Sequence, residues 1–327
     1  MQTLILNGSI VQSLADDPLV MEAVEEAFRL AGLGQVQMPS KSYLTFPEFS
    51  GDLRTMPAYL PHLQASGVKV VNSHPLNPRA GLPTVMALIV LNDPVSGFPQ
   101  AILSATALTA LRTAAAGALA AKLLARTDAA SAGFIGAGTQ ARYQFRFLKL
   151  VRPIRSIAVY DVDKSRAEQF CEQARADGID ANVAPTAKDA AAAPIVVTTT
   201  PGRGPVCAAT AFLPGCHINA IGADAPGKQE LPPEILIRAK VVVDHREQAI
   251  HSGEINIPIA RGLFPPARIH AELGEIVAGQ KPGRAGDKDI TIFDSTGLAI
   301  QDIAVAKRVF DRALDKGLGT RVDFGVD

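Results

Sequence analysis

The sequence predicts an α/β protein with a doubly wound parallel sheet and a second, smaller α+β domain. Between residues 130 and 300, Val- and Ile-rich segments alternate with helical ones, which is typical of a parallel sheet covered on both faces. Residues 38–105 instead form short apolar runs separated by Pro and Gly, a pattern of strands without intervening helices. With 47% hydrophobic and 20% charged residues, the 327-residue chain can bury a substantial core.

Composition also excludes several classes of function. The formal net charge is zero and no basic block occurs, so nothing favours nucleic acid or an anionic membrane as partner. We find no run of 18 uncharged apolar residues and no signal peptide. The three cysteines and six histidines show no metal-ligand spacing. We therefore expect a cytoplasmic protein without a metal site.

The first part of the chain contains one predicted helix and then predicted strands. Residues 14–31 carry an apolar stripe at helical spacing and end at Gly32, which predicts an amphipathic helix. The strands that follow are expected at residues 42–46, 55–60, 67–73, 84–93 and 100–104. "NDPVSG" between the last two predicts a hairpin turn, and an Ala-rich helix follows over 107–126.

The second part alternates strand and helix. A strand and glycine turn at 131–138 lead into a helix at 139–151, and a strand at 156–161 leads into a helix at 164–178. Further strands are expected at 193–200, 216–223, 239–245 and 289–295, before a final helix at 296–317. We expect one domain over residues 1–115, a doubly wound domain over 116–300, and a C-terminal segment 301–327 that returns to the first.

"GFIGAGTQA" is the G-x-G-x-x-A form of the Rossmann dinucleotide-binding fingerprint. Gly136 permits the tight turn, Gly138 lets a pyrophosphate approach the backbone, and Ala141 lets the helix pack closely on its strand. Asp161 ends the next strand, where the fingerprint places a ribose-binding carboxylate. Such a carboxylate repels a 2′-phosphate, so we expect NAD(H) as cofactor rather than NADP(H). Arg155 or Lys164 would favour the alternative, NADP(H).

Two cations interrupt apolar surroundings. Arg112 shares a helix face with Leu108, Ala115 and Leu119. It lies either at a solvated helix edge or beside a cleft, where a substrate carboxylate or cofactor phosphate offsets its desolvation. Lys69 interrupts a Val run and is either an exposed edge-strand lysine or an active-site group.

The remaining candidates have equally plain alternatives. Asp224 follows a strand at the expected ligand-binding edge, where it suits proton transfer or caps the next helix. Thr200 belongs either to a loop over the cofactor or to an ordinary loop. Helix capping alone explains Ser295 and Thr296. Lys41 and Arg54, which complete the candidate set, are ordinary surface cations when taken singly.

Several of these segments together resemble the ornithine cyclodeaminase/μ-crystallin family over nearly the whole chain. They are "RTMPAYL", "GVKVVNSHPLN", "LTALRTAAAGALAAKLLAR", "GFIGAGTQA", "NAIGADAPGKQEL" and "FDSTGLAIQDIAVAK". The resemblance implies dimers with a Rossmann domain and a smaller domain that builds the dimer interface and the substrate site. Family members reduce imino acids, oxidise amino acids or cyclise ornithine with a nicotinamide cofactor.

By the resemblance, Lys69 matches an active-site lysine, Asp224 the catalytic aspartate, and Arg112 an arginine that reaches substrate carboxylate and cofactor. The full set of expected substrate-binding residues is Lys41, Arg54, Lys69, Arg112 and Thr296. The full set of expected cofactor-binding residues is Thr84, Arg112, Gly136, Gly138, Thr139, Gln140, Asp161, Thr200, Ala220, Lys228 and Ser295.

One departure bears on the substrate. Ornithine-cyclising members carry a glutamate two residues before the Met-Pro pair, whereas this chain has Arg54, which should repel the δ-ammonium of ornithine. Arg54 instead suits a carboxylate, and with Lys41 and Arg112 it would clamp the acid end of a substrate. Lys69, its pKa lowered by neighbouring cations, would supply the proton to an imine nitrogen, and Asp224 would share it.

The sequence thus predicts NADH-dependent reduction of a small α-imino acid to the L-amino acid, or the reverse dehydrogenation. Iminosuccinate-like or alanine-type imino acids come first as substrates, then pyrroline-2-carboxylate, and ornithine last. A hydroxyproline dehydratase and a non-enzymatic nucleotide-binding protein are the remaining alternatives.

Overall fold

A computed structural model describes residues 1–325, and the chain forms two compact units. Unit 1 comprises Met1–Arg112 and Leu298–Asp327, and unit 2 comprises Thr113–Gly297. Residues 326 and 327, the end of the expected returning segment 301–327, lie outside the described residues. Unit 1 is therefore built from both ends of the chain, and unit 2 is one continuous segment.

A seven-stranded sheet forms the centre of unit 1, in the order β15-β1-β6-β5-β4-β3-β2. The β1–β6 pair is parallel and the other pairs are antiparallel. The strands are β1 (Thr3–Leu6), β2 (Ser42–Phe46), β3 (Gly51–Leu60), β4 (Ala65–Ser73), β5 (Val85–Asn92), β6 (Pro99–Ser104) and β15 (Thr320–Val322). The sequence predicted β2 to β6 and missed the short strands β1 and β15, which pair with each other.

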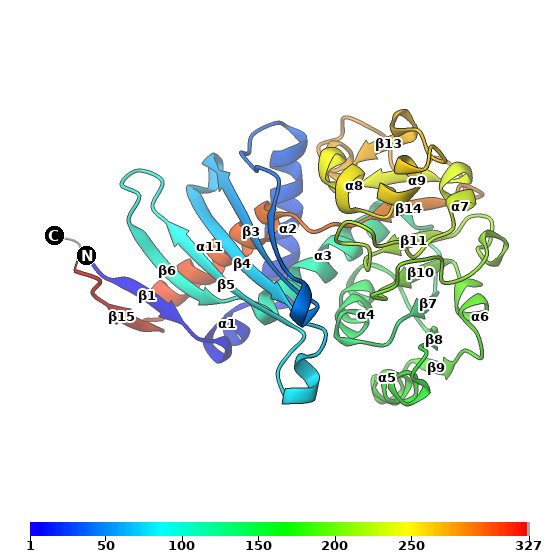
Figure 1. Ribbon diagram of the computed structural model, residues 1–327, viewed down its shortest axis with the longest axis horizontal. Coiled ribbons are helices and arrows are strands. Elements are labelled where there is room, and N and C mark those ends of the chain that lie inside the picture. The colour runs from blue at the N-terminus through cyan, green and yellow to red at the C-terminus, as the bar shows by residue number, and fades with distance from the viewer. Residues whose placement is uncertain (326–327) are drawn as a thin grey trace. The chain divides into compact units, whose positions relative to one another are not determined.

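Three helices belong wholly to unit 1: α1 (Gly8–Leu14), α2 (Asp17–Gly32) and α11 (Ala299–Asp315). The single helix expected over residues 14–31 is wrong at its start, because α1 ends at Leu14. Asp16 then caps α2 by accepting a hydrogen bond from Leu19 N at 2.9 Å. Helices α2 and α11 contact each other and lie behind the sheet (Figure 1), and α11 also contacts β3, β4 and β5.

The two faces of this sheet differ in chemistry. On the face toward α11, Arg54, Met56, Lys69 and Ile89 are all buried, and the strand registers place them on one side. Alternate residues point to the other face, where apolar side chains remain exposed: Leu44 is 61% exposed and Leu88 52%. A pair of buried cationic residues on interior strands of the sheet is the unusual feature of unit 1.

Unit 2 is a doubly wound domain around eight parallel strands, in the order β13-β12-β14-β11-β10-β7-β8-β9 (Figure 1). The strands are β7 (Ser131–Ile135), β8 (Ser156–Tyr160), β9 (Asp180–Val183), β10 (Ile195–Thr198), β11 (His217–Ala220), β12 (Lys240–Val243), β13 (Ile269–Glu272) and β14 (Thr291–Asp294). The predicted fold class is confirmed. The sequence missed β9 and β13 at the two edges of the sheet.

Alternate residues of β10 show that the sheet is covered on both faces. Ile195 and Val197 belong to a core shared with α3, α4 and α5, whereas Val196 belongs to a core shared with α6 and α7. The other helices are α3 (Thr106–Leu124), α4 (Thr139–Val151), α5 (Lys164–Ala176), α6 (Ala187–Ala191), α7 (Pro233–Arg238), α8 (Arg246–Ser252), α9 (Asn256–Ala260) and α10 (Leu273–Val277). Helix α3 begins in unit 1 and ends in unit 2.

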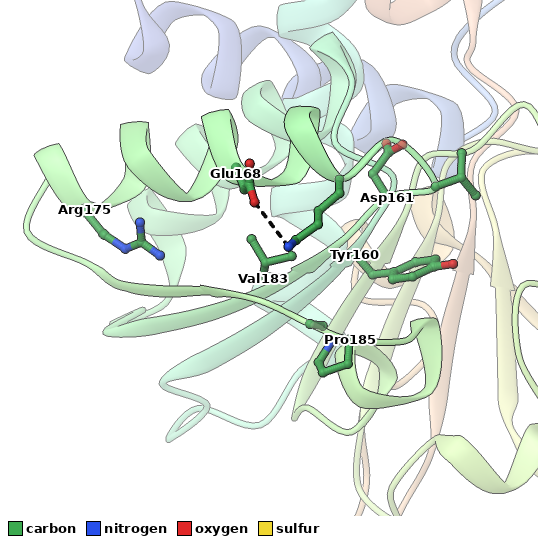
Figure 2. Close-up of a pocket in the computed structure, with 9 residues that line it drawn as sticks. Tyr160, Asp161, Glu168, Arg175, Val183 and Pro185 are labelled. Atoms are coloured by element: carbon green, nitrogen blue, oxygen red, sulfur yellow. Dashed lines mark ion pairs between the residues drawn. The ribbon is translucent and has the colours of Figure 1, made fainter.

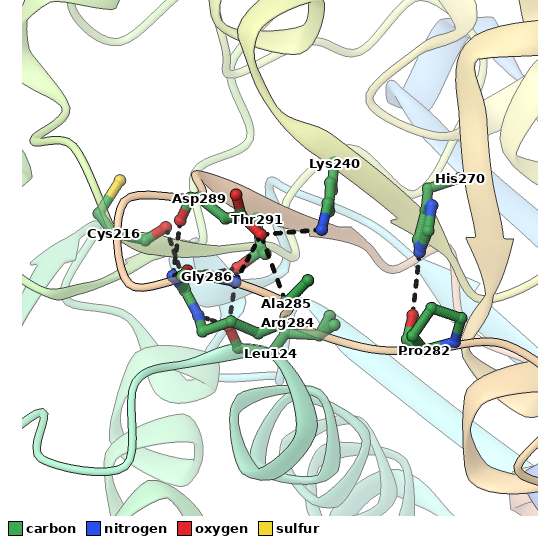
Figure 3. A network of polar contacts seen from close by, with 10 residues as sticks. All are labelled: Leu124, Cys216, Lys240, His270, Pro282, Arg284, Ala285, Gly286, Asp289 and Thr291. Atoms are coloured by element: carbon green, nitrogen blue, oxygen red, sulfur yellow. Dashed lines mark hydrogen bonds and ion pairs between the residues drawn. The ribbon is translucent and has the colours of Figure 1, made fainter.

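Helix α3 is apolar and long enough to cross a membrane by length and composition, but 67% of its most apolar window is buried, as in the core helix of a soluble protein. Its carboxyl end is held by two arginines. Arg284 donates to Leu124 O at 2.6 Å and to Asp289 O at 2.7 Å (Figure 3). Arg152 donates to Ala125 O at 3.0 Å. These cations meet backbone carbonyls at a helix end, so their role is structural.

Candidate functional site

The glycine turn after β7 has the geometry that the fingerprint requires. Gly136 has φ +98°, and a Cβ there would lie 2.8 Å from Thr199 Oγ1, so only glycine fits. Gly138 begins α4 without a side-chain cap, and a Cβ on it would meet no protein atom within 4 Å. Ala141 is fully buried. The glycine at 138 is therefore not required by packing, which leaves close approach of a ligand to the helix N-terminus as its reason.

Two polar residues follow directly at the start of α4. Thr139 is exposed, and Gln140 is half-buried. Within residues 1–325 the Gln140 Nε2 atom is buried and has no hydrogen-bond partner. A buried amide donor without an acceptor is costly. A bound anion at this turn would satisfy it.

Asp161 lies at the carboxyl end of β8 and ties the turn to that strand. Its Oδ2 accepts from Ala137 N at 2.7 Å, and its Oδ1 accepts from Asp163 N at 2.8 Å. The lone pairs left on both oxygens can accept ribose hydroxyls. Arg155 precedes β8 at its amino end, the opposite end from Asp161, which removes one of the two cations that favoured NADP(H).

A cavity of about 680 Å³ adjoins Asp161 at the carboxyl ends of β8 and β9 (Figure 2). Tyr160, Val183 and Pro185 give it apolar surface, and charged groups of α5 line the rest. Lys164, the other cation that favoured NADP(H), is 3.5 Å from Glu168 Oε1 in an exposed ion pair (Figure 2). Its charge is partly offset by that neighbour.

The loops after β10 and β11 carry the next expected residues. Thr200 N donates to Glu230 Oε1 at 2.6 Å, and Ala220 is the buried last residue of β11. Asp224 Oδ1 lies 2.5 Å from Lys228 Nζ, in a half-exposed ion pair. Asp224 does not cap a helix, because the next helix, α7, has Pro232 at its N-cap. The capping alternative for Asp224 is therefore wrong.

Ser295 and Thr296 are likewise not helix caps, because Leu298 precedes α11. Ser295 N donates to Ala220 O at 3.0 Å, which joins the end of β14 to β11. Thr296 donates to the buried Asp244 through its backbone N at 2.6 Å and its Oγ1 at 2.8 Å. The hydroxyl of Thr296, expected to bind substrate, is thus engaged by a carboxylate of unit 2.

In unit 1, Lys69 is fully buried on the interior strand β4, so the exposed edge-strand alternative is wrong. Its Nζ lies 2.7 Å from Asp302 Oδ2 on α11, and within residues 1–325 this is its one polar partner. Burial and the nearby Arg112 lower the pKa of Lys69 to about 7, and Lys41 acts in the same direction, while Asp302 opposes them. An amine with this pKa can give or take a proton at neutral pH.

Arg112 is the second cation on the same carboxylate. Its Nε donates to Asp302 Oδ1 at 2.9 Å and its Nη1 donates to Gln301 Oε1 at 2.9 Å. The solvated-edge alternative is wrong, because Arg112 is 5% exposed. Asp302 of the same unit offsets part of the charge for which the sequence predicted a ligand anion, and binding of that anion stays a prediction.

Arg54 and Lys41 complete the cluster, and both are buried rather than on the surface. Arg54 forms a two-pronged ion pair with Asp52, with Nε–Oδ1 at 2.8 Å and Nη2–Oδ2 at 3.0 Å. Both cations lie over the ring of Tyr43, Arg54 at 5.5 Å and Lys41 at 5.8 Å from its centroid. Thr84, expected near the cofactor, precedes β5 and accepts from His74 N through its backbone oxygen at 2.8 Å.

Sequence reasoning missed the buried acids, among them Asp302 and Glu230. Asp302 lies in "AIQDIAVA", where the first turns of α11 are apolar all round, so an acid there had no solvent-facing position. That pattern was a usable signal for a buried counter-ion. Glu230, which holds the Thr200 loop, follows a proline-glycine loop and gave no such signal.

The glycine turn, the open space at Gly138 and the acid at Asp161 together fit a dinucleotide, and they define a Rossmann-type dinucleotide-binding protein with a separate unit that carries buried cations. Residues 1–317 match the ornithine cyclodeaminase/mu-crystallin family. The chain belongs to this family.

Several solved structures are similar over nearly the whole chain, and three of them are described below. An archaeal alanine dehydrogenase dimer with bound NAD is 53% identical, with a TM-score of 0.96, and covers 99% of this chain and 100% of its own. The Delta(1)-pyrroline-2-carboxylate reductase of Thermococcus litoralis, in complex with NADH and L-proline, is 39% identical (TM-score 0.95; 98% and 100% covered). The iminosuccinate reductase of Paracoccus denitrificans, in complex with NAD+, is 29% identical (TM-score 0.92; 99% and 100% covered).

Proposed function

We propose that this protein reduces a small α-imino acid to the L-amino acid with NADH, or catalyses the reverse dehydrogenation. Its class is that of an NAD(H)-dependent oxidoreductase acting on C=N or CH–NH2 groups, in keeping with the NAD- and NADH-bound family members. Bound NADH supplies the hydride to the imine carbon. Gly136, Gly138 and Gln140 would hold its pyrophosphate, and Asp161 its adenosine ribose.

The observation that carries the proposal is the state of Lys69. Its amine is fully buried, has one polar partner among residues 1–325, and has a pKa of about 7. A buried ammonium has three N–H donors, so two remain for a ligand. In the reductive direction Lys69 gives one proton to the imine nitrogen as the imine carbon receives the hydride; in the reverse direction it takes that proton back.

Arg112 and Lys41 would bind the substrate carboxylate. Arg112 keeps donors beyond those used on Asp302 and Gln301. Lys41 is close enough to lower the pKa of Lys69, so it belongs to the same charge cluster. From the family resemblance we assign to Asp224 the role of holding the substrate nitrogen.

The pairing of Arg54 bears on the choice of substrate. Asp52 already offsets the Arg54 charge in a two-pronged ion pair, so a second substrate carboxylate has less to gain there. We therefore rank monocarboxylic imino acids, of the alanine type or the cyclic pyrroline-2-carboxylate, above dicarboxylic iminosuccinate. The same pairing weakens the repulsion between Arg54 and a cationic side chain such as that of ornithine, so Lys41 is the cation that disfavours ornithine.

An NADH-oxidation assay tests the function. Pyruvate with ammonia, preformed pyrroline-2-carboxylate, and oxaloacetate with ammonia are compared by loss of absorbance at a fixed NADH concentration. We expect turnover with the first two and a value of kcat/KM at least tenfold lower with the third. NADH binding without turnover of any imine would refute the proposal and favour a nucleotide-binding protein.

We further propose a cytoplasmic homodimer that buries the exposed face of the unit 1 sheet. Leu44 and Leu88 lie on that face and are 61% and 52% exposed. Such a patch on a sheet typically marks an interface, and the archaeal relative is a dimer. Light scattering should give twice the chain mass, and Leu88→Asp should give a monomer; a monomeric wild type would refute the dimer.

A further inference from the structure

Glu230 is a fully buried acid that has no role in the proposed function. Its carboxylate joins two loops. Its Oε1 accepts from Thr200 N at 2.6 Å. Its Oε2 accepts from Thr198 Oγ1 at 2.6 Å and from Gly222 N at 2.8 Å. Thr198 ends β10, and Gly222 follows the neighbouring strand β11. One side chain therefore fixes the ends of two adjacent strands.

The loops after β10 and β11 are tightly packed against each other at Gly222. A Cβ on Gly222 would lie 2.2 Å from Thr200 O and 2.6 Å from Glu230 Oε1. The loop after β10 thus rests directly on the loop after β11, with the Glu230 carboxylate against both. A shift of one loop must displace the other.

Each loop leads to a part of the candidate site. Thr199 N donates to Ile135 O at 2.9 Å, and its side chain packs on Gly136, so the loop after β10 supports the glycine turn. On the other loop, Asp224 N donates to Gly222 O at 3.1 Å. Glu230 therefore connects the dinucleotide turn to the segment that carries Asp224.

Glu230 is itself held by a second buried acid. The Glu254 carboxylate accepts from Glu230 N at 3.0 Å and from Leu231 N at 2.6 Å. In turn, Glu254 N donates to Asp294 Oδ1 at 2.8 Å, at the end of β14. Neither glutamate has a lysine, arginine or histidine partner among residues 1–325.

The carboxylates of Glu230 and Glu254 therefore accept hydrogen bonds from backbone N–H groups, and that of Glu230 also accepts one from the Thr198 hydroxyl. Burial raises the pKa of Glu230. Burial and the adjacent Glu230 raise that of Glu254. Buried carboxylates that depend on backbone donors are expensive to maintain, so they are expected where exact backbone placement matters.

We propose that Glu230 is a positioning residue that sets the loops after β10 and β11 for dinucleotide binding and for the action of Asp224. The first part concerns the cofactor alone. The second part rests on the proposed function, because it assigns Asp224 a role in turnover.

Glu230→Gln tests the proposal, since it keeps the shape but turns an acceptor into an amide donor that faces a backbone N–H. Glu234→Gln, an exposed acid four residues away, is the matched control for loss of one charge. We expect the Kd of NADH, measured by calorimetry well below the melting temperature, to rise at least tenfold in Glu230→Gln, which is about 1.4 kcal/mol. The control should keep the wild-type Kd. A lower melting temperature with an unchanged Kd would overturn the proposal, because it would show a purely structural role.

Thr198→Val covers the case in which Glu230→Gln does not fold, because it removes one donor and leaves the carboxylate in place. Its control is Thr198→Ser, which keeps the hydroxyl and should keep wild-type binding. We expect Thr198→Val to weaken NADH binding and Thr198→Ser to restore it; equal Kd values in the two variants would overturn the proposal.

Turnover separates this inference from the proposed function. At saturating NADH, kcat for the imino acid should fall at least tenfold in Glu230→Gln, with a smaller change in KM. If kcat is unchanged in a variant that binds NADH weakly, the Asp224 part is overturned. If no imine is turned over by the wild type and the Kd effect is present, the proposed function fails while the cofactor part stands.

Discussion

Replacing Asp302 by asparagine should shift the pH at which the protein works. The change keeps the size of the side chain on α11 but removes the negative charge that lies 2.7 Å from Lys69 Nζ. Asp302 is the group that holds the Lys69 pKa up to about 7 against burial and against Arg112 and Lys41. Without it the ammonium is surrounded by cations in a desolvated site, so its pKa must fall further.

The size of the shift follows from the strength of the contact. A hydrogen bond to a charged group contributes about 1.5–3 kcal/mol, and one pKa unit corresponds to about 1.4 kcal/mol. Loss of the Asp302 charge should therefore move the Lys69 pKa from about 7 to about 5–6. Because the reductive direction needs the protonated amine, kcat should decline above pH 7 in the wild type and already above pH 5–6 in the variant.

The assay is a series of kcat measurements between pH 5 and 9, with saturating NADH and a preformed cyclic imine. At pH 7 about half of the wild-type amine and about 1–9% of the variant amine is protonated, so the variant should retain about one fifth of wild-type kcat or less. Asp311→Asn is the matched control, since Asp311 lies on the same helix in a partly exposed ion pair with Lys307. A profile with the same inflection in Asp302→Asn and wild type would refute the assignment of Lys69 as the proton donor.

Three further predictions concern stability and cofactor binding. Lys69→Met should remove a pH dependence of the free energy of unfolding. The amine of Lys69 loses its proton near pH 7 in the folded state and near pH 10.5 in the unfolded state, so wild-type stability should rise between pH 7 and 9 by up to about 1.4 kcal/mol per pH unit relative to the variant. Urea unfolding measures this difference, and parallel curves of stability against pH would contradict it. Gly138→Ala should weaken NADH binding about tenfold in calorimetry with an unchanged melting temperature, because its Cβ enters open space. Gly136→Ala, strained at φ +98°, should lower the melting temperature, and the reverse pattern would contradict the ligand-based reason for Gly138. Arg284→Ala should cost about 1–3 kcal/mol of unfolding free energy with kcat unchanged, and an intact stability would show that its carbonyl contacts are dispensable.

Local pattern was sufficient for most of the fold. Strand β2 could be predicted from its five residues, and the Rossmann unit from the glycine turn and the repeated strand–helix order. Strands β9 and β13 could not, because "DANV" and "IHAE" have no apolar run and become strands only by pairing with β8 and β12.

In the candidate site, too, contacts between residues distant in the sequence could not be predicted from local pattern. That Arg112 is buried could be read from its helix face, but its partner Asp302 lies 190 residues away in the sequence, and only the fold brings them together. The Arg54–Asp52 pair was within reach, because residues two apart on a strand share a face, and "GDLRT" shows both. Thr296 was misread because the helix after it starts later, at Ala299.

The two-segment origin of unit 1 has a consequence for how cofactor choice and substrate choice can change. The chain crosses between the units only after Arg112 and before Leu298, so Thr113–Gly297 behaves as a cassette. Lys69, Arg112 and Asp302 all remain outside that cassette, although they come from opposite ends of the gene product. Exchange of the cassette for that of an NADP(H)-dependent relative should therefore alter the coenzyme and leave unchanged Lys69, the proposed proton donor, together with Arg112 and Asp302.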